Sequence, residues 1–219
     1  PYNPCVFSAE GYFVFQPDIV YRPQEPGLSA VDCVVPAVEK VLETGMVDPG
    51  RVGLMGHSWG AYQTSFIVTR TDLFSAAVAG APLTDLMSMS VSVYWNSGGT
   101  NARIFAQSQG RMNKPFWRDA ENYARNSPIH GLDTLNTRLL IAFGDKDGAV
   151  DWDQGIEMYN AARWAGKDDV VLLVYPGENH GLRKEENMVD YHYRVREWMA
   201  HFLKDETGRK WITEGKSFL

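Results

Sequence analysis

The sequence predicts an α/β fold built on a mostly parallel β-sheet with helices on both of its faces. Two observations support this prediction. Short apolar runs typical of buried strands alternate with helical patterns five times along the 219 residues. Three reactive residue types, in Ser58, Asp147 and His180, each come shortly after one of these runs. Because parallel strands present their carboxyl ends at one edge of the sheet, we expect these side chains to meet there.

The composition allows one large domain with a sizeable core, since 44% of the residues are apolar and 22% are charged. A formal net charge of −6 argues against nucleic acid or an anionic membrane surface as the main partner. No apolar run in the sequence approaches the ~18 residues of a membrane span. Cys5 and Cys33 match neither a disulfide framework nor a metal pattern, so we expect two small buried hydrophobes and neither a metal nor a cofactor.

The first part of the chain is expected to hold one strand and one helix. Residues 12–20 have the apolar content of a buried strand, with a proline near its end. Residues 21–27 carry two prolines and a glycine and are predicted to be a loop. Residues 28–43 have a helical apolar spacing that Pro36 interrupts. Either the helix kinks at Pro36, or its regular part begins there with proline in its first turn.

The later elements continue the alternation, apart from one long excursion. Residues 83–136 hold aromatic residues and methionines among polar residues and glycines, which favours short helices and loops over a second core. Further buried strands are predicted at residues 51–57, 74–82, 138–143 and 170–175. One helix is predicted from the end of the strand at 51–57 to about Arg70, and two more over residues 151–165 and 187–204. The core face of the last helix is expected to carry Met188, Tyr191, Val195, Trp198 and Phe202.

Residues 56–60 read GHSWG and fit the pattern G-x-S-x-G between a predicted strand and a predicted helix. In that setting the serine stands in a tight strand-to-helix turn, with its hydroxyl clear of the sheet. The two glycines let neighbouring backbone approach closely, and the helix N-terminus adds positive potential and free N–H groups. Ser58 is therefore predicted to be a nucleophile beside a site that can hold an oxyanion.

A serine nucleophile needs a base, and histidine has the unperturbed pKa that suits this role. Of the five histidines, His180 lies in a glycine-flanked turn after a predicted strand. The others lie in the motif itself, in a loop with no strand before it, or on the last helix: His57, His130, His192 and His201. His180 is therefore the candidate base. The orienting carboxylate stays open from the residues alone, because Asp145 and Asp147 share one turn and Asp151 and Asp153 lie nearby.

Three segments in this order resemble the catalytic domain of the prolyl oligopeptidase family of serine peptidases, which includes dipeptidyl peptidases and acylaminoacyl peptidases. They are GHSWGAYQ at residues 56–63, G-x-x-D-x-x-V at residues 144–150 and YPGENHG at residues 175–181. The resemblance implies an α/β-hydrolase fold with Ser58 as nucleophile, Asp147 as orienting carboxylate and His180 as base. It also implies that the Trp59 backbone N–H is one oxyanion donor.

The same resemblance implies that residues 1–219 are the C-terminal part of a longer catalytic domain. The family's sheet begins with three more strands, one of them between the strands predicted at residues 12–20 and 51–57, and a β-propeller comes before them. A tyrosine of that part supplies the family's second oxyanion donor. We therefore expect a fold that lacks its first strands, with the upstream part of its own chain as a partner. Assembly into a homo-oligomer stays open, as do a cytoplasmic and a periplasmic or secreted location.

The expected function is hydrolysis of the peptide bonds of short peptides through an acyl-enzyme intermediate. Two alternatives stay open: a carboxylesterase or other acyl hydrolase on the same fold, since a fold does not determine the acyl group, and a non-catalytic interaction domain. Intact Ser58, Asp147 and His180 argue against the second alternative.

The excursion at residues 83–136 is expected to form much of the substrate pocket. The candidate lining residues are Tyr62, Met89, Tyr94 and Trp95, for which ordinary packing is the alternative interpretation.

Overall fold

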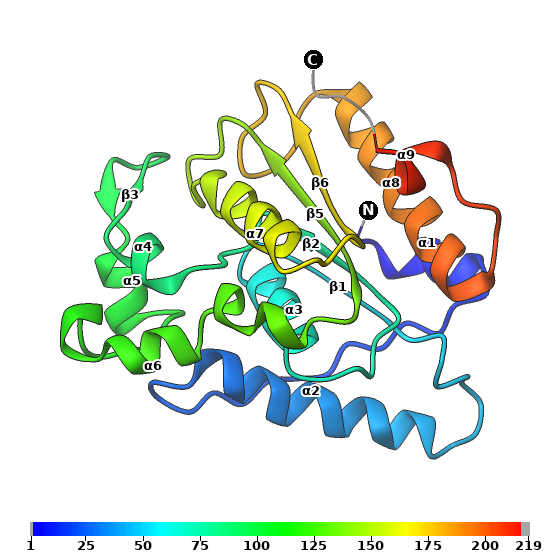
Figure 1. Cartoon of the computed structure of the whole chain (residues 1–219), viewed down its shortest axis with the longest axis horizontal. Helices are drawn as coiled ribbons and strands as arrows, with labels where there is room; N and C mark the ends of the chain where they lie inside the picture. Colours follow the sequence, from blue (N-terminus) through cyan, green and yellow to red (C-terminus); the bar gives the residue numbers. More distant parts are fainter. Residues whose placement is uncertain (1, 216–219) are drawn as a thin grey trace.

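The computed structural model of the chain describes residues 2–215 and has a parallel sheet at its centre. Four strands, β1 (Gly53–His57), β2 (Ala76–Gly80), β5 (Arg138–Gly144) and β6 (Val170–Tyr175), lie in the order in which they occur along the chain (Figure 1). Every neighbouring pair is parallel. The carboxyl ends of all four strands therefore lie at one edge of the sheet, as the sequence predicts.

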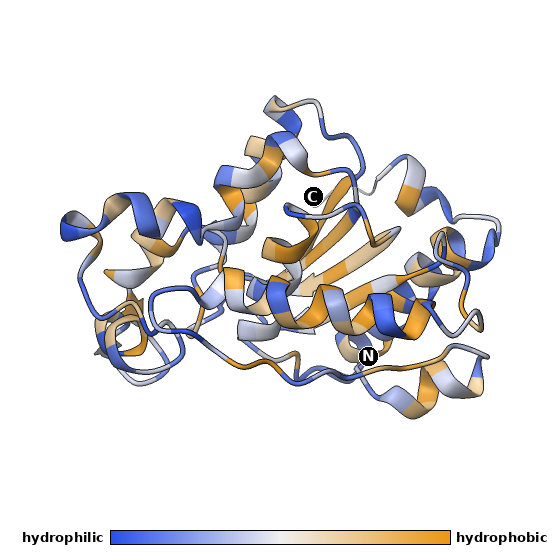
Figure 2. Cartoon of the chain, turned by 90° about the horizontal axis from the view of Figure 1, so that it is seen from below, coloured by the Kyte–Doolittle hydropathy of each residue, from blue (hydrophilic) through white to orange (hydrophobic). Residues whose placement is uncertain are grey.

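Helices cover both faces of the sheet, because side chains alternate between the faces along each strand. On one face, Ala77 and Ile141 pack with α2 (Pro26–Leu42), α3 (Trp59–Val68) and α7 (Asp153–Trp164). On the other face, Val78 and Leu140 pack with α1 (Pro4–Ala9) and α8 (Glu185–Lys204) (Figure 1). Figure 2 shows hydrophobic strands at the centre, with helices around them that carry both hydrophilic and hydrophobic residues. The predicted fold class is confirmed.

The excursion between β2 and β5 consists of short elements, and its buried side chains join the core on the α3 face. Leu86, Met89, Phe105 and Tyr123 all belong to that core. The sequence did not predict the small antiparallel hairpin between β3 and β4. The elements of the excursion are α4 (Leu86–Ser90), β3 (Val93–Tyr94), β4 (Gly99–Thr100), α5 (Ala102–Gln107), η1 (Phe116–Arg118), α6 (Ala120–Arg125) and η2 (Pro128–Thr134).

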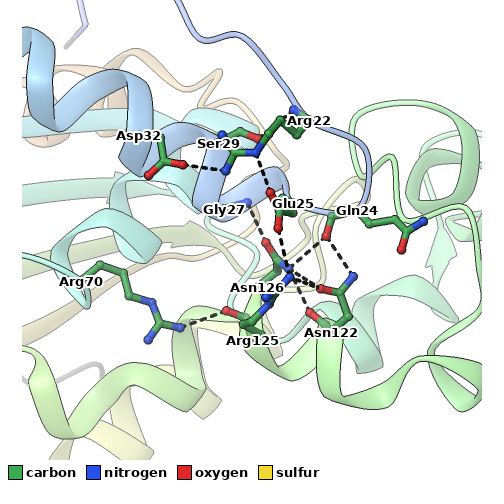
Figure 3. Close-up of polar contacts among 10 residues, drawn as sticks. All are labelled: Arg22, Gln24, Glu25, Gly27, Ser29, Asp32, Arg70, Asn122, Arg125 and Asn126. Carbon is green, nitrogen blue, oxygen red and sulfur yellow. Dashed lines mark hydrogen bonds and ion pairs between the residues drawn. The ribbon is translucent and has the colours of Figure 1, made fainter.

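A fully buried asparagine fastens the excursion to the loop before α2 (Figure 3). The Asn126 side chain accepts a hydrogen bond from the Gly27 N–H and donates to the carbonyl oxygens of Gln24 and Asn122. The Asn126 carbonyl in turn accepts the hydroxyl of Tyr62 on α3. Two segments about 100 residues apart in the sequence are thus joined through one amide.

The strand predicted at residues 12–20 is wrong. The segment is irregular and largely exposed, with Phe13 and Val20 73% and 75% accessible to solvent. Its Val20 N–H contacts the sulfur of Cys33 on α2 instead of a neighbouring strand. Extended backbone becomes a strand only where a second strand accepts its hydrogen bonds, and residues 2–215 provide no such partner here.

The structure also differs from several smaller predictions. Helix α2 runs through Pro36 rather than beginning there. Cys5 is exposed and Cys33 half-buried, so neither is the fully buried small hydrophobe that was expected. Met188, near the start of α8, is 43% exposed because it lines an open cavity instead of the core. Among residues 2–215, no helix combines the length and apolar character that crossing a bilayer requires.

Candidate active site

Ser58 occupies the tight turn between β1 and α3. Its φ of 58° and ψ of −121° lie in a region that non-glycine residues rarely adopt, and such strain is concentrated at functional sites. The Ser58 N–H donates to the Gly80 carbonyl at 2.8 Å, which fixes the turn to β2. A Cβ at Gly56 would lie 2.3 Å from the Gly60 carbonyl oxygen, so only glycine fits where strand and helix cross.

A continuous chain of hydrogen bonds joins the three side chains that the sequence places at the strand ends. His180 Nε2 lies 2.8 Å from Ser58 Oγ, and His180 Nδ1 lies 2.8 Å from Asp147 Oδ2. A carboxylate can only accept, so Nδ1 carries the proton and Nε2 is left to accept the Ser58 hydroxyl. This is the tautomer that a general base toward Ser58 requires.

Asp147 is held by backbone as well as by His180. Its side chain is fully buried, and Oδ1 accepts the N–H groups of Ala149 and Val150, both at 2.9 Å. The neighbouring candidate, Asp145, points elsewhere and accepts the Gly177 N–H at 2.6 Å. The geometry therefore identifies Asp147, and not Asp145, as the carboxylate that contacts His180, a choice that the sequence alone left open.

His57, which ends β1, lies against the imidazole of His180 with 4.9 Å between ring centroids. Burial lowers the pKa of His57, and the nearby His180 lowers it further. His57 thus favours a neutral ring beside His180. The sequence assigned no role to His57, because proximity along the chain excluded it as a base without showing where its ring would lie.

A cavity of about 670 Å³ opens on the α8 side of these histidines. His57 and His180 line it together with mostly apolar groups such as Leu182, Met188 and Tyr191. Within residues 2–215 no group of three or more His, Cys, Asp or Glu side chains is arranged to hold a metal ion.

Two of the four candidate pocket residues are core residues instead. Tyr62 is fully buried, and its hydroxyl is occupied by the Asn126 carbonyl at 2.9 Å. Met89 is only 2% exposed. Both face inward because α3 and α4 pack into the core on that face of the sheet. Tyr94, on β3, is half-buried, whereas Trp95 in the following turn is 67% exposed.

The Trp59 backbone N–H belongs to the first residue of α3, directly after Ser58. The first N–H groups of a helix have no partner within the helix and carry its positive end. The Trp59 ring packs on Tyr62 with 4.7 Å between centroids, which holds this first turn against the core.

Two curated relatives each match most of this chain. The acylamino-acid-releasing enzyme of Rattus norvegicus is 30% identical over 189 residues, covering 86% of this chain and 25% of the relative. The enzyme of the same name from Arabidopsis thaliana is 26% identical over 174 residues, covering 79% of this chain and 22% of the relative. The chain thus spans about a quarter of the length of these curated relatives.

A solved structure, a puromycin-hydrolyzing peptidase of Mycobacterium tuberculosis, superposes with a TM-score of 0.72 at 24% sequence identity. The match covers 82% of this chain and 26% of that one, and it supports the α/β-hydrolase fold. The model of the prolyl oligopeptidase family matches residues 24–206, which include Ser58, Asp147 and His180. The chain therefore belongs to the prolyl oligopeptidase family.

Proposed function

We propose that the protein is a serine-type peptidase that hydrolyses peptide bonds of short peptides through an acyl-enzyme. The observation that carries the proposal is the unbroken hydrogen-bond chain from Ser58 through His180 to Asp147. Membership of the prolyl oligopeptidase family and the names of the relatives support peptides as the substrate class.

In the proposed first step, Ser58 Oγ attacks the carbonyl carbon of the scissile bond while His180 Nε2 removes its proton. Asp147 keeps the proton on Nδ1 and stabilises the imidazolium that forms, without itself taking up the proton. The negative charge on the substrate oxygen develops near the start of α3, where the Trp59 N–H is the proposed donor. Removing one such donor from a serine hydrolase typically costs about 10²- to 10³-fold in rate.

In the second step, His180 donates its proton to the departing amine, and the acyl group stays on Ser58 as an ester. Water, activated by the same imidazole, then attacks this ester and releases the acid. Protonation of the leaving group is the step that separates amide from ester cleavage, because an amine is expelled only after it has been protonated.

The proposal is tested by turnover of aminoacyl, dipeptidyl and N-acylaminoacyl amides beside an activated ester, using the full-length protein. We expect turnover of at least one amide class, and loss of that turnover in Ser58→Ala. An enzyme that cleaves nitrophenyl esters but no amide would instead be an esterase. Full amide turnover by Ser58→Ala would overturn the assignment of the nucleophile.

A further inference from the structure

The side chain next to His180 in sequence joins the two loops that carry His180 and Asp147. Asn179 Oδ1 accepts the N–H of Gly148, the residue after Asp147, at 2.9 Å. The same oxygen accepts the backbone N–H of His180 at 2.6 Å. One amide oxygen thus binds the backbone beside both residues, independently of the bond between their side chains.

The nitrogen end of the same amide reaches the hairpin of the excursion. Asn179 Nδ2 donates to Asn96 Oδ1 at 2.8 Å, and Asn96 Nδ2 lies 3.3 Å from Asn179 Oδ1. Asn96 lies in the turn between β3 and β4, directly after the exposed Trp95. Its backbone N–H also donates to the Gly148 carbonyl at 2.8 Å. Three separate segments therefore converge on a pair of amides.

The contact at Gly148 is close enough to restrict the residue there. A Cβ added to Gly148 would lie 2.4 Å from Asn96 Oδ1 and 3.1 Å from the Asn96 backbone nitrogen. An alanine would displace the Asn96 side chain, because contacts under 3.0 Å do not occur for real Cβ atoms. The glycine is therefore part of the same contact.

We propose that Asn96, Gly148 and Asn179 form an asparagine clasp in which Asn179 positions the loops of Asp147 and His180, while Asn96 anchors the β3–β4 hairpin to them. The proposal rests on the proposed peptidase function. Its consequence is that the two asparagines have separate roles. Asn179 acts on the reacting groups through the loops, whereas Asn96 holds the hairpin whose half-buried Tyr94 and exposed Trp95 we expect a peptide to contact. A displacement of about 1 Å in such loops can cost about 10²-fold in rate.

The clasp is tested with four variants of the full-length protein: Asn179→Ala, Asn96→Ala, Gly148→Ala and the double variant Asn96→Ala/Gly148→Ala. Ser97→Ala is the matched control, since Ser97 is exposed in the same turn and its hydroxyl donates to the Tyr94 carbonyl. Three measurements are made on each: kcat and KM for an activated ester and for a peptide amide, the labelling rate of Ser58 by a fluorophosphonate, and hydrogen exchange at the backbone amide of position 148.

We expect Asn179→Ala to lower kcat for both substrates by 10-fold or more, to slow labelling and to speed exchange at Gly148. Asn96→Ala should raise KM for the peptide several-fold while leaving kcat for the ester within 2-fold. Gly148→Ala should reproduce Asn96→Ala, and the double variant should be no worse than Asn96→Ala. Ser97→Ala should match the wild type.

The clasp would be overturned if Asn179→Ala labels at the wild-type rate and its Gly148 amide exchanges as in the wild type. If Asn96→Ala lowered kcat for the ester as much as it raised KM for the peptide, the separate roles of the two asparagines would be contradicted. A wild-type protein that the fluorophosphonate does not label would count against the peptidase proposal, whereas exchange at Gly148 would still decide the clasp.

Discussion

Ser58 and Asp147 show how the neighbouring backbone fixes a functional group. The positive φ of Ser58 is maintained because its N–H binds β2 and its carbonyl accepts the Tyr62 N–H in the first turn of α3. Asp147 is fixed by two N–H groups of its own turn. Strain at one residue is thus stabilised by hydrogen bonds contributed by its neighbours.

Replacing Asp147 by Asn should lower kcat/KM by roughly 10³- to 10⁴-fold, because an amide at this position favours the wrong tautomer of His180. Asp145→Asn is the matched control from the same turn. Its amide oxygen can still accept the Gly177 N–H, so we expect a change within a few-fold. Steady-state kinetics on both variants decide the matter, and equal losses would show that Asp147 has no special role.

At the residue scale, the sequence predicted which residue types would meet but not which of two carboxylates would face His180. The strand ends placed Ser58 and His180 together because parallel strands share an edge. Asp145 and Asp147 accept different backbone N–H groups, and this difference depends on a turn whose path tertiary contacts determine. The resemblance to the family supplied Asp147, and its catalytic role stays a prediction.

At the element scale, helices and strands were predicted correctly where a segment's own pattern determines its structure. They were predicted wrongly where the structure depends on a partner segment. The run at residues 12–20 is apolar enough for a strand, yet it is exposed without a neighbouring strand. Tyr62 was expected to line the pocket, but neighbouring elements bury it. Helix α3 packs between α2 and the sheet and is buried nearly all round, so its sequence has no polar face that would mark an exposed position.

The fastening of the excursion by Asn126 gives a prediction about stability. Asn126→Ala removes the acceptor of the buried Gly27 N–H and leaves the Gln24 carbonyl with one donor fewer. Each unsatisfied buried polar group costs about 1–3 kcal/mol, so we expect a loss of about 2–4 kcal/mol in the free energy of unfolding. Urea denaturation measures it.

The exposed Asn136, which binds Asp72 on the surface, provides the comparison. Asn136→Ala should change the free energy of unfolding by no more than about 0.5 kcal/mol. Similar losses in the two variants would show that burial of the Asn126 network contributes little.

At the scale of the whole molecule, two cores on opposite faces of one sheet support the active-site edge from both sides. The α8 core is tied to the His180 loop by a buried carboxylate, Glu178, which is 3% exposed. It accepts hydrogen bonds from the Arg183 and Lys184 N–H groups and from the Asn187 side chain. Burial acts to raise the pKa of Glu178, but these three hydrogen bonds outweigh it and lower the pKa below its usual value.

This lowered pKa predicts how stability depends on pH. The unfolded chain binds a proton at Glu178 more readily than the folded chain, so the carboxylate's contribution is complete above the unfolded pKa of about 4.3. It is lost as the pH falls through the lower pKa of the folded state. Glu178→Gln should therefore reduce stability at pH 7 and flatten its decline below about pH 4.3.

Thermal unfolding from pH 7 to pH 3 tests this prediction. Asn187→Ala removes one of the three donors and should give an intermediate slope. If Glu178→Gln loses stability at acidic pH as steeply as the wild type, then other groups control the acid response and the linkage to Glu178 is wrong.

We propose that His180 and Asp147 make Ser58 nucleophilic. The most direct measurement is the rate and site of covalent labelling of the full-length protein by a fluorophosphonate, with the adduct located by peptide mass spectrometry. We expect a single adduct on Ser58, none in Ser58→Ala, and labelling slowed at least 100-fold in His180→Ala. An adduct on another residue, or an undiminished rate in His180→Ala, would contradict the claim.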